Sequence, residues 1–423
     1  MWRVERTLWG IVEQKTVGLK RALGPVLLTL YGVGVTVGAG IYVLVGEVAG
    51  TAGMGAPVAF LIAGVLAGLS ALSYAELSIR FPQAGGEAAF VSAAFARRWL
   101  TLFIGLLVVF TGGTSSAAVL LGFVGYLNAL VEVSDGLVVT GAVAVLAVIT
   151  FWGVRESLLI VAAITVVEIG GLLLVIGSGL PLLGGLPAAL PEMLPGLDGI
   201  VWLGLFSASV LAFFAFIGFE DIVNMAEEVR EPHKTMPRAI LFTLTISTIL
   251  YVALAIVSVL SVEPGRLAGS GAPLAMVFEA NGGNPDVLSA IAIPAVLNGA
   301  LVQIIMASRL LYGMAELGRL PKVLAHINPV TRTPDVAVGV VSLVVLASAL
   351  VLPIAELATY ASLAVLLVFS TVNAALLVLR RTASYKASGT GFRVPAVVPI
   401  IGATASLSLF GFGLASAFGL IAY

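Results

Sequence analysis

The sequence predicts an all-α integral membrane protein in which ten spans form an inverted five-plus-five helix repeat and an eleventh transmembrane helix follows. Three observations support this fold class: the composition, the lengths of the apolar segments and the one-sided placement of Lys and Arg. Of the 423 residues, 60% are hydrophobic and 10% are charged, with a mean hydropathy of +1.13. A soluble domain has about 25% charged residues, so the composition excludes that class.

Eleven segments have the length that a bilayer requires, which is about 20 apolar residues. Before them, residues 1–23 form a charged cytoplasmic N-terminal segment that lacks the apolar core and cleavage site of a signal peptide. Residues 394–422 are expected to form one tilted helix, because two halves would each be too short to span. The predicted spans are 24–49, 57–79, 99–127, 136–153, 157–179, 201–225, 239–261, 288–312, 336–352, 357–379 and 394–422.

The basic residues give an independent test of this topology. With a cytoplasmic N-terminus and alternating loops, every Lys and Arg except Arg266 lies on the cytoplasmic side, as the positive-inside rule requires. We therefore expect a multi-pass protein of the cell membrane with an extracellular C-terminus and the lipid bilayer, not nucleic acid, as its surroundings. The acidic loop residues on the opposite side are Glu132, Asp135, Glu192, Asp198, Glu263, Glu279 and Asp286.

Two spans are interrupted by glycine-containing stretches in corresponding places. The first carries GVGVTVGAGIY from Gly32 to Tyr42, and the sixth carries FFAFIGFED from Phe213 to Asp221. Unwound backbone in a bilayer is tolerated where it is buried in protein or lines a cavity, and paired broken helices point to a transporter's substrate site. The offset of five spans inverts the second repeat relative to the first. The predicted divisions are 24–180, 181–380, and 381–423 for the last loop and span.

The breaks predict a ligand with opposite charges on adjacent atoms. Freed amides at the first break form an anion site that the helix dipole reinforces, and freed carbonyls near Val35 and Thr36 suit a cation. The second break presents the reverse arrangement, so an amino acid satisfies both breaks. The alternative is that the glycines only allow tight helix packing. The residues concerned are Thr36, Gly38, Ala39, Gly40 and Ile41 in the first break and Phe214, Ala215 and Ile217 in the second.

Four stretches also carry a resemblance to a known family. They are GVGVTVGAGIYVLVG from Gly32, YAELSIRFPQAGGEAAFV from Tyr74, FFAFIGFEDIVNMAEEVREPHKTMPRAI from Phe213 and SRLLYGMAELGRLP from Ser308. Through them nearly the whole chain resembles the amino acid–polyamine–organocation superfamily, most closely its prokaryotic cationic-amino-acid-transporter-like branch.

The resemblance implies a LeuT-type fold that binds the substrate carboxylate at the span 1 amides and the ammonium at the span 6 carbonyls. It also implies that Phe219 closes over the substrate. Two departures are that most members have twelve spans and an aromatic residue where this chain has Ala88 and Ala89.

Glu168 is an acidic residue within the fifth span, with no basic residue within ten positions. A charge there costs at least about 2.5 kcal/mol, so such residues face the bundle interior and mark ion or proton routes. By the resemblance, Glu168 matches a lysine of proton-coupled members, and Asn298 matches the hydroxyl residues beside the same ion site. We favour Glu168 as the proton carrier. The alternatives are a ligand of Na⁺ and a neutral packing contact.

The remaining polar candidates are weaker. Thr114 lies in a hydroxyl-rich run that could line the substrate pocket, although such hydroxyls often bond their own backbone. Glu76 and Arg80 are spaced as an i,i+4 pair near the cytoplasmic end of span 2. Glu220 and Asp221 could face the ion path or bond freed amides. The two histidines lie far apart in the sequence, so no metal site and no cofactor are expected.

These features predict a secondary active transporter that moves amino acids by alternating access, with proton coupling through Glu168. Nothing in the chain has the paired His or Asp spacing of a membrane enzyme. A sodium-coupled or exchange-mode transporter and a non-transporting amino acid sensor with the same fold remain alternatives. Apart from Glu220 and Asp221, no acidic residue is expected near the pocket. An apolar or small neutral amino acid is therefore the expected substrate.

Overall fold

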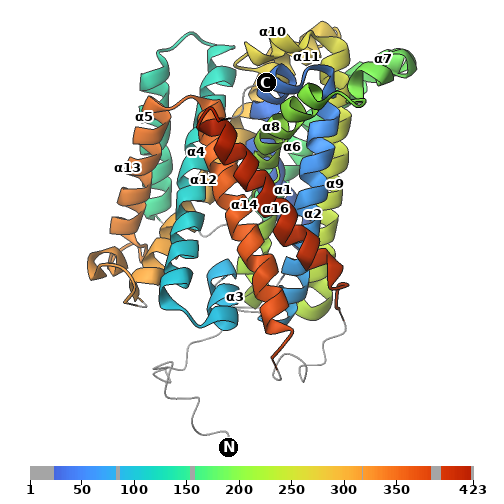
Figure 1. The fold of residues 1–423 in the computed structure, drawn as a ribbon. Helices are drawn as coiled ribbons and strands as arrows, with labels where there is room; N and C mark the ends of the chain where they lie inside the picture. Colours follow the sequence, from blue (N-terminus) through green and yellow to red (C-terminus); the bar gives the residue numbers. More distant parts are fainter. Residues whose placement is uncertain (1–22, 82–85, 153–157, 317, 383–391, 421–423) are drawn as a thin grey trace, which may run out of the picture.

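The protein is a bundle of membrane-spanning helices in the computed structural model, which describes residues 23–81, 86–152, 158–316, 318–382 and 392–420 (Figure 1). The described residues contain no β-strand; their only strand-like contact is a bridge between Leu23 and Val229. The prediction of an all-α membrane protein is confirmed, and the arrangement is consistent with a LeuT-type fold.

Every predicted span corresponds to a helix of the structure. Nine described segments are long and apolar enough to cross a membrane; one, Gly40–Arg80, includes the second half of the first helix, and α13 is slightly shorter. The spanning elements are α1 (Pro25–Ala52), α2 (Ala56–Arg80), α4 (Arg98–Asn128), α5 (Asp135–Trp152), α6 (Leu158–Gly179), α8 (Gly199–Phe214) with the 3₁₀ helix η4 (Phe219–Glu228), α9 (Pro232–Ser261), α12 (Pro285–Glu316), α13 (Asp335–Val351), α14 (Ile354–Leu379) and α16 (Val397–Ala417).

Short helices lie at the two ends of the bundle. In Figure 1, α3 lies at the lower end and α7, α10 and α11 lie at the upper end, with α7 projecting beyond the bundle. Their bounds are α3 (Gly86–Phe95), α7 (Leu186–Met193), α10 (Pro264–Ala268) and α11 (Pro273–Ala280), with 3₁₀ turns η2 (Gly53–Gly55), η3 (Leu180–Gly185) and η5 (Lys322–Ala325).

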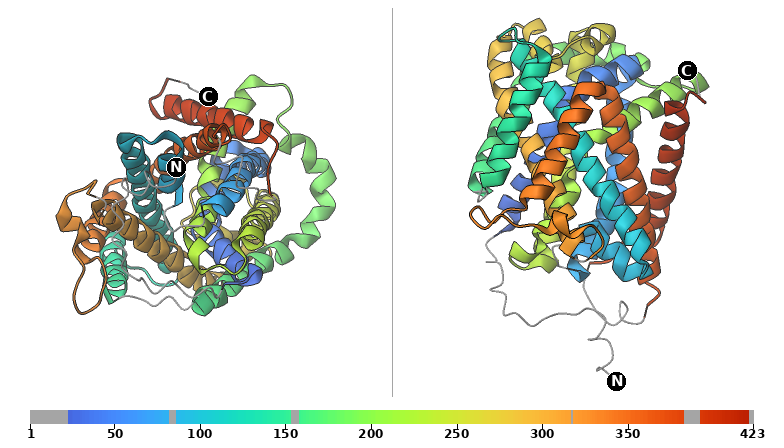
Figure 2. Two further views of the ribbon diagram at one scale, coloured as in Figure 1. Left: turned by 90° about the horizontal axis from the view of Figure 1, so that it is seen from below. Right: turned by 90° about the vertical axis from the view of Figure 1, so that its left-hand side faces the viewer.

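Helix α1 lies at the centre of the bundle, where it packs against α6, α8, α9 and α12. The chain just before α1 lies against the chain just after η4, because the Arg230 N–H donates a hydrogen bond to the Leu23 carbonyl at 2.8 Å. By contrast, α5 and α13 pack against each other at the periphery (Figures 1 and 2). The first and sixth spans are therefore central, as a site built from them requires.

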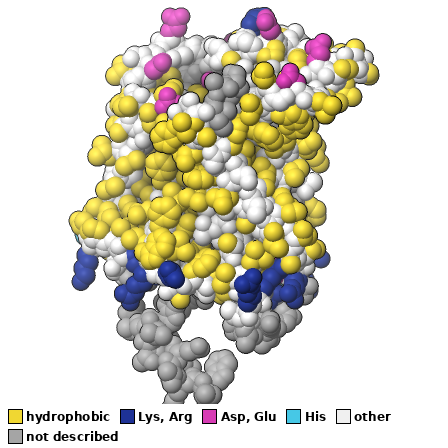
Figure 3. Space-filling view, in the orientation of Figure 1, with side chains coloured by type: hydrophobic (Ala, Val, Ile, Leu, Met, Phe, Trp, Pro, Cys, Tyr) yellow, Lys and Arg dark blue, Asp and Glu magenta, His cyan; other side chains and the backbone are white. Residues whose placement is uncertain are grey.

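Charge is separated between the two ends of the bundle. Figure 3 shows Lys and Arg mainly at the lower end, Asp and Glu at the upper end together with some basic atoms, and a hydrophobic belt between the two ends. We call these ends the basic face, where α2 ends at Arg80 and α4 begins at Arg98, and the acidic face, where α5 begins at Asp135. The separation is the one that the loop charges predicted.

The predicted break in the first span is wrong. Helix α1 is continuous from Pro25 to Ala52, so its interior amides are held in the helix and form no freed anion site. The physical reason is close packing, which was the alternative explanation for these glycines. A methyl group at Gly32 would lie 2.4 Å from Ile222 Cδ1, and one at Gly34 would lie 1.9 Å from Thr165 Oγ1. The main-chain amides that were predicted to be free but lie inside the helix are those of Gly38, Ala39, Gly40 and Ile41.

Candidate functional site

The second predicted break is present in the structure. Helix α8 ends at Phe214, and the N–H groups of Ala215, Phe216 and Ile217 bond carbonyls three residues back. Gly218 then has a φ of 122°, which side chains rarely adopt. The chain continues as the 3₁₀ helix η4 from Phe219. The sixth span therefore leaves the α-helical path near its middle.

Two side chains bond to backbone groups that the break exposes. The Tyr251 hydroxyl of α9 lies 2.8 Å from the Ala215 carbonyl and 2.9 Å from the Thr36 carbonyl of α1. The Gly218 N–H donates to Glu220 Oε2 at 2.8 Å. This bond confirms one of the two roles that the sequence left open for Glu220. Sequence analysis missed Tyr251, for which the only signal was a tyrosine near the middle of the seventh predicted span.

The Ala215 carbonyl accepts the Tyr251 hydroxyl, and the next two carbonyls, those of Phe216 and Ile217, have no such bond to Tyr251. No described main-chain N–H donates to either of them, since the helix that would normally supply such donors has ended. A carbonyl without a helical partner can accept a hydrogen bond from an ammonium group. Of the three positions predicted at this break, Ile217 is the one with such a carbonyl, since the Phe214 carbonyl accepts the Ile217 N–H and the Ala215 carbonyl accepts the Tyr251 hydroxyl.

The structure brings the two predicted stretches into direct contact. A methyl group at Gly40 of α1 would lie 2.2 Å from Ala215 Cα, and one at Gly218 would lie 2.9 Å from the Val35 carbonyl oxygen. The Thr36 hydroxyl donates to the Gly32 carbonyl of its own helix. In this conformation α1 packs tightly against the break. The site candidates Thr36, Ile41, Phe214, Ala215, Ile217 and Phe219 are all buried.

Phe219, the first residue of η4, belongs to a buried aromatic cluster. Its ring centroid lies 5.8 Å from that of Tyr74 and 5.3 Å from that of Phe369, both in edge-on contact. Edge-to-face pairs of this kind are favourable beyond the area they bury. The position is compatible with a side chain that closes over a ligand at the break.

Glu168 lies where α6 meets α1 and α12. The side chain is fully buried, and neither carboxyl oxygen has a hydrogen-bond partner among the described residues. A methyl group at Gly38 would lie 3.1 Å from Glu168 Oε1 and 3.0 Å from the Ala295 carbonyl oxygen. Oxygen atoms of α6 and α12 therefore converge on one point of α1, next to the break.

Asn298 of α12 interacts with the Glu168 carboxyl. Its own Nδ2 is buried and, within the described part of the chain, has no hydrogen-bond partner. The Tyr42 hydroxyl donates to the Glu168 main-chain carbonyl at 2.6 Å, and Tyr126 donates to the Tyr42 carbonyl at 2.6 Å. The first bond fixes α6 against α1 and the second fixes α4 against α1, and neither involves the Glu168 carboxyl.

Three acidic side chains, Glu87, Glu220 and Asp221, lie beside the break. The sequence analysis named only the last two. Glu87 of α3 accepts a hydrogen bond from the Tyr74 hydroxyl at 3.2 Å and interacts electrostatically with Glu220 and Asp221. All three carboxyl groups are buried. Glu87 was not proposed as a site residue, although it follows the paired glycines in one of the stretches that carry the family resemblance.

Two other predicted groups have structural partners. Thr114 donates to the Phe110 carbonyl at 2.8 Å, so its hydroxyl bonds its own helix. Glu76 lies 3.8 Å from Arg80 but makes a closer bond to Arg380, the residue directly after α14, whose Nε donates to Glu76 Oε1 at 3.0 Å. The Val394 N–H also donates to Glu76, at 2.8 Å. These bonds tie together α2, α14 and the segment before α16.

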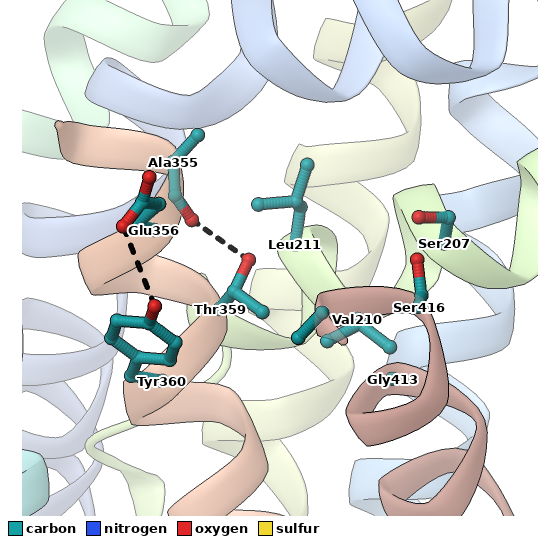
Figure 4. Close-up of a pocket in the computed structure, with 10 residues that line it drawn as sticks. Ser207, Val210, Leu211, Ala355, Glu356, Thr359, Tyr360, Gly413 and Ser416 are labelled. Atoms are coloured by element: carbon teal, nitrogen blue, oxygen red, sulfur yellow. Dashed lines mark hydrogen bonds between the residues drawn. The ribbon is translucent and has the colours of Figure 1, made fainter. Parts of the chain in front are cut away.

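A cavity of 280 Å³ lies among α8, α14 and α16 (Figure 4). The Thr359 hydroxyl in its wall donates to the Ala355 carbonyl, and the Tyr360 hydroxyl donates to Glu356. These partners are on the same helix, and none of the predicted site residues lines this cavity. It is therefore distinct from the predicted site.

Neither the histidines nor the carboxyl groups form a metal site in the part of the chain that the structure describes. His326 Nδ1 lies 2.6 Å from Asp335 Oδ1, and no group of three or more potential ligands is found among the described side chains.

Comparison with known proteins agrees with the membrane fold. Residues 23–420 match the family model described as "Amino acid permease". The chain is 30% identical to the branched-chain amino acid permease BcaP of Bacillus subtilis, over 86% of this chain and 82% of the relative. It is 31% identical to cationic amino acid transporter 2, vacuolar, of Arabidopsis thaliana, over 86% of this chain and 60% of that protein. It is also 31% identical to the methylthioribose transporter of B. subtilis, over 92% and 88% of the two chains.

Proposed function

Because this chain belongs to the amino acid permease family, we propose that it is a proton-coupled secondary active transporter that moves an amino acid across the membrane by alternating access. The family and the relatives are permeases and transporters, not enzymes. We assign the basic face to the cytoplasm by the positive-inside rule, which puts residue 23 inside and residue 420 outside.

The observation that carries the proton assignment is the position of Glu168. Its buried carboxyl has no described hydrogen-bond partner, yet it touches Gly38 of α1, the helix that packs on the break. A movement of α1 away from α6 changes the surroundings of this carboxyl directly. Uptake and release of a proton at Glu168 are thereby linked to the contact between α1 and the break.

The substrate is proposed to bind where α1 faces the break, near Thr36 and Gly40. Its ammonium bonds the carbonyls of Phe216 and Ile217, to which no described main-chain N–H donates, and Phe219 covers it. Since α1 and the break are in contact, binding requires the two to separate, as alternating access demands. Asn298 supports the Glu168 carboxyl from α12.

Two substrate types are supported by different observations. An apolar amino acid agrees with the apolar side chains of the break and with the branched-chain permease relative. A cationic amino acid agrees with the buried carboxyls of Glu87, Glu220 and Asp221 and with the plant relative. Leucine and arginine compared in a thermal-shift assay separate these types, and a shift with neither would contradict both.

Glu168→Gln tests the coupling. In proteoliposomes with an imposed pH gradient, the variant should lose proton-driven accumulation but retain counterflow of labelled substrate, because glutamine keeps the shape and cannot carry a proton. Glu47→Gln, the same change in α1 away from this junction, should behave like the unmodified protein. Undiminished proton-driven accumulation by Glu168→Gln contradicts the carrier role.

Sodium is a second candidate ion, because the Ala295 carbonyl and Glu168 Oε1 converge on Gly38 and oxygen is the ligand such a cation prefers. Uptake that follows a Na⁺ gradient at constant pH, and is lost in Glu168→Gln, would favour it. Binding without uptake or counterflow in the unmodified protein would instead indicate a sensor.

A further inference from the structure

A cavity of 550 Å³ separates the peripheral helix α5 from α4, α6 and α12. Its wall is formed by aliphatic and aromatic side chains and one glycine, and Asn298 is the single polar residue in it. The wall extends along α5 from Leu137 to Ile149, which is about 18 Å at the rise of an α-helix. None of the predicted substrate-binding residues lines it.

The cavity begins at the acidic face and continues into the hydrophobic belt. Val133, just before α5, and Leu127, near the end of α4, line its outer part. Half the hydrocarbon thickness of a bilayer is about 15 Å, so the cavity is slightly deeper than one leaflet. An extended hydrocarbon chain that enters at the acidic face has the length to fill it.

The cavity is continuous with the lipid-facing surface of the bundle. Helix α5 packs mainly on α13, and its side chains Leu137 and Val145, which line the cavity, are also 71% and 57% exposed. At this depth the surrounding medium is lipid. A site with one polar group and an otherwise apolar wall excludes an ionic or sugar ligand, since polar groups buried without partners are costly.

We propose that this cavity is a binding site for one acyl chain of a phospholipid from the leaflet at the acidic face. The chain covers the side of Asn298 that lines the cavity, while the same residue interacts with Glu168. If Glu168 carries the proton as proposed above, the bound chain keeps water away from its α12 side and restricts proton exchange to the α1 side.

The experiment uses a tryptophan in the cavity wall as the probe. The full chain carrying Phe123→Trp is reconstituted in vesicles of phosphatidylcholine brominated in its acyl chains, which quench a tryptophan in contact with them. The introduced indole should be quenched beyond the background of the five native tryptophans. Absence of this extra quenching overturns the proposal.

A matched pair of glycines shows whether the quenching chain lies in the cavity. A β-carbon at Gly141, in the wall, and one at Gly136, on α5 outside the wall, would each meet nothing within 4 Å. Adding Gly141→Phe should abolish the extra quenching, whereas adding Gly136→Phe should leave it.

If the extra quenching persists in Gly141→Phe and also in the second cavity-filling variant, Ala142→Phe, the quenching chain lies on the outer lipid surface. That result overturns the proposal. The readout does not depend on transport. A failure of the proton assignment would therefore leave the quenching result unchanged, and the two proposals can fail separately.

Discussion

The first and sixth spans contain similar glycine-bearing stretches, Gly32–Tyr42 and Phe213–Asp221, yet only the second interrupts its helix. In α1, glycines lie where another helix occupies the space that a side chain would need. At the break, Gly218 takes a φ of 122°. The first stretch uses the small size of glycine and the second uses its conformational freedom.

Hydrogen bonding explains why the two stretches differ. Leaving the helical path exposes backbone groups that the bilayer cannot satisfy. Beside the break, Tyr251 bonds the Ala215 carbonyl and Glu220 bonds the Gly218 N–H. In α1, the nearby Thr36 hydroxyl bonds its own helix instead. The groups freed at the break are thus bonded by neighbouring side chains, whereas α1 remains a continuous helix from Pro25 to Ala52.

The largest effect is expected from Gly40→Ala, which tests the packing role of α1. The added methyl group would lie 2.2 Å from Ala215 Cα, and backbone at that distance cannot move aside without displacing a helix. We expect the free energy of unfolding to fall by about 3 kcal/mol, which is at the upper end for overpacking. Thermal unfolding in detergent measures this change. An unchanged melting temperature would show that α1 does not press on the break.

Gly218→Ala tests the conformational role at the break. A side chain at a φ of 122° is strained, and its β-carbon would lie 2.9 Å from the Val35 carbonyl oxygen. The free energy of unfolding is expected to fall by about 2 kcal/mol, measured in the same way. Gly53→Ala is the control for strain alone, because its φ is 57° and its β-carbon meets nothing within 4 Å. Equal losses would mean that the contact with α1 contributes nothing.

Tyr251→Phe removes the hydroxyl that links the two stretches. The Ala215 carbonyl loses this partner in a buried position, which should lower stability by about 1–2 kcal/mol and reduce transport. Tyr360→Phe removes a hydroxyl whose bond to Glu356 is long, at 3.4 Å, and exposed, so it should change little. A Tyr251→Phe protein as stable as the unmodified one would indicate that the break does not need this bond.

The smallest effect is expected from Gly170→Ala, in α6. Its β-carbon would meet nothing within 4 Å, so the higher helix propensity of alanine should stabilise the protein by up to about 1 kcal/mol. The next residue is the matched opposite, since a β-carbon at Gly171 would lie 2.5 Å from the Tyr42 hydroxyl. If Gly171→Ala is equally stabilising, close packing is not the reason for glycine in these helices.

Residue chemistry alone indicates much of the candidate site. Glu168 is conspicuous because a charge in an apolar span is costly, and the structure places it beside α1 and Asn298. Tyr251 and Glu87 were missed because nothing local marks a tyrosine or a helix-starting glutamate as a partner for a distant break. Arg380 was missed as the partner of Glu76 because the two are 304 positions apart.

The sequence by itself determined the membrane class, the spans, the separation of charge and the presence of an acid within the bilayer. These properties depend on local composition and on the fixed thickness of hydrocarbon. Only the tertiary structure decided which glycine stretch opens, what surrounds Glu168 and where a lipid-facing cavity lies. Each of those depends on atoms that distant segments bring together, and the pattern of a single span does not contain them.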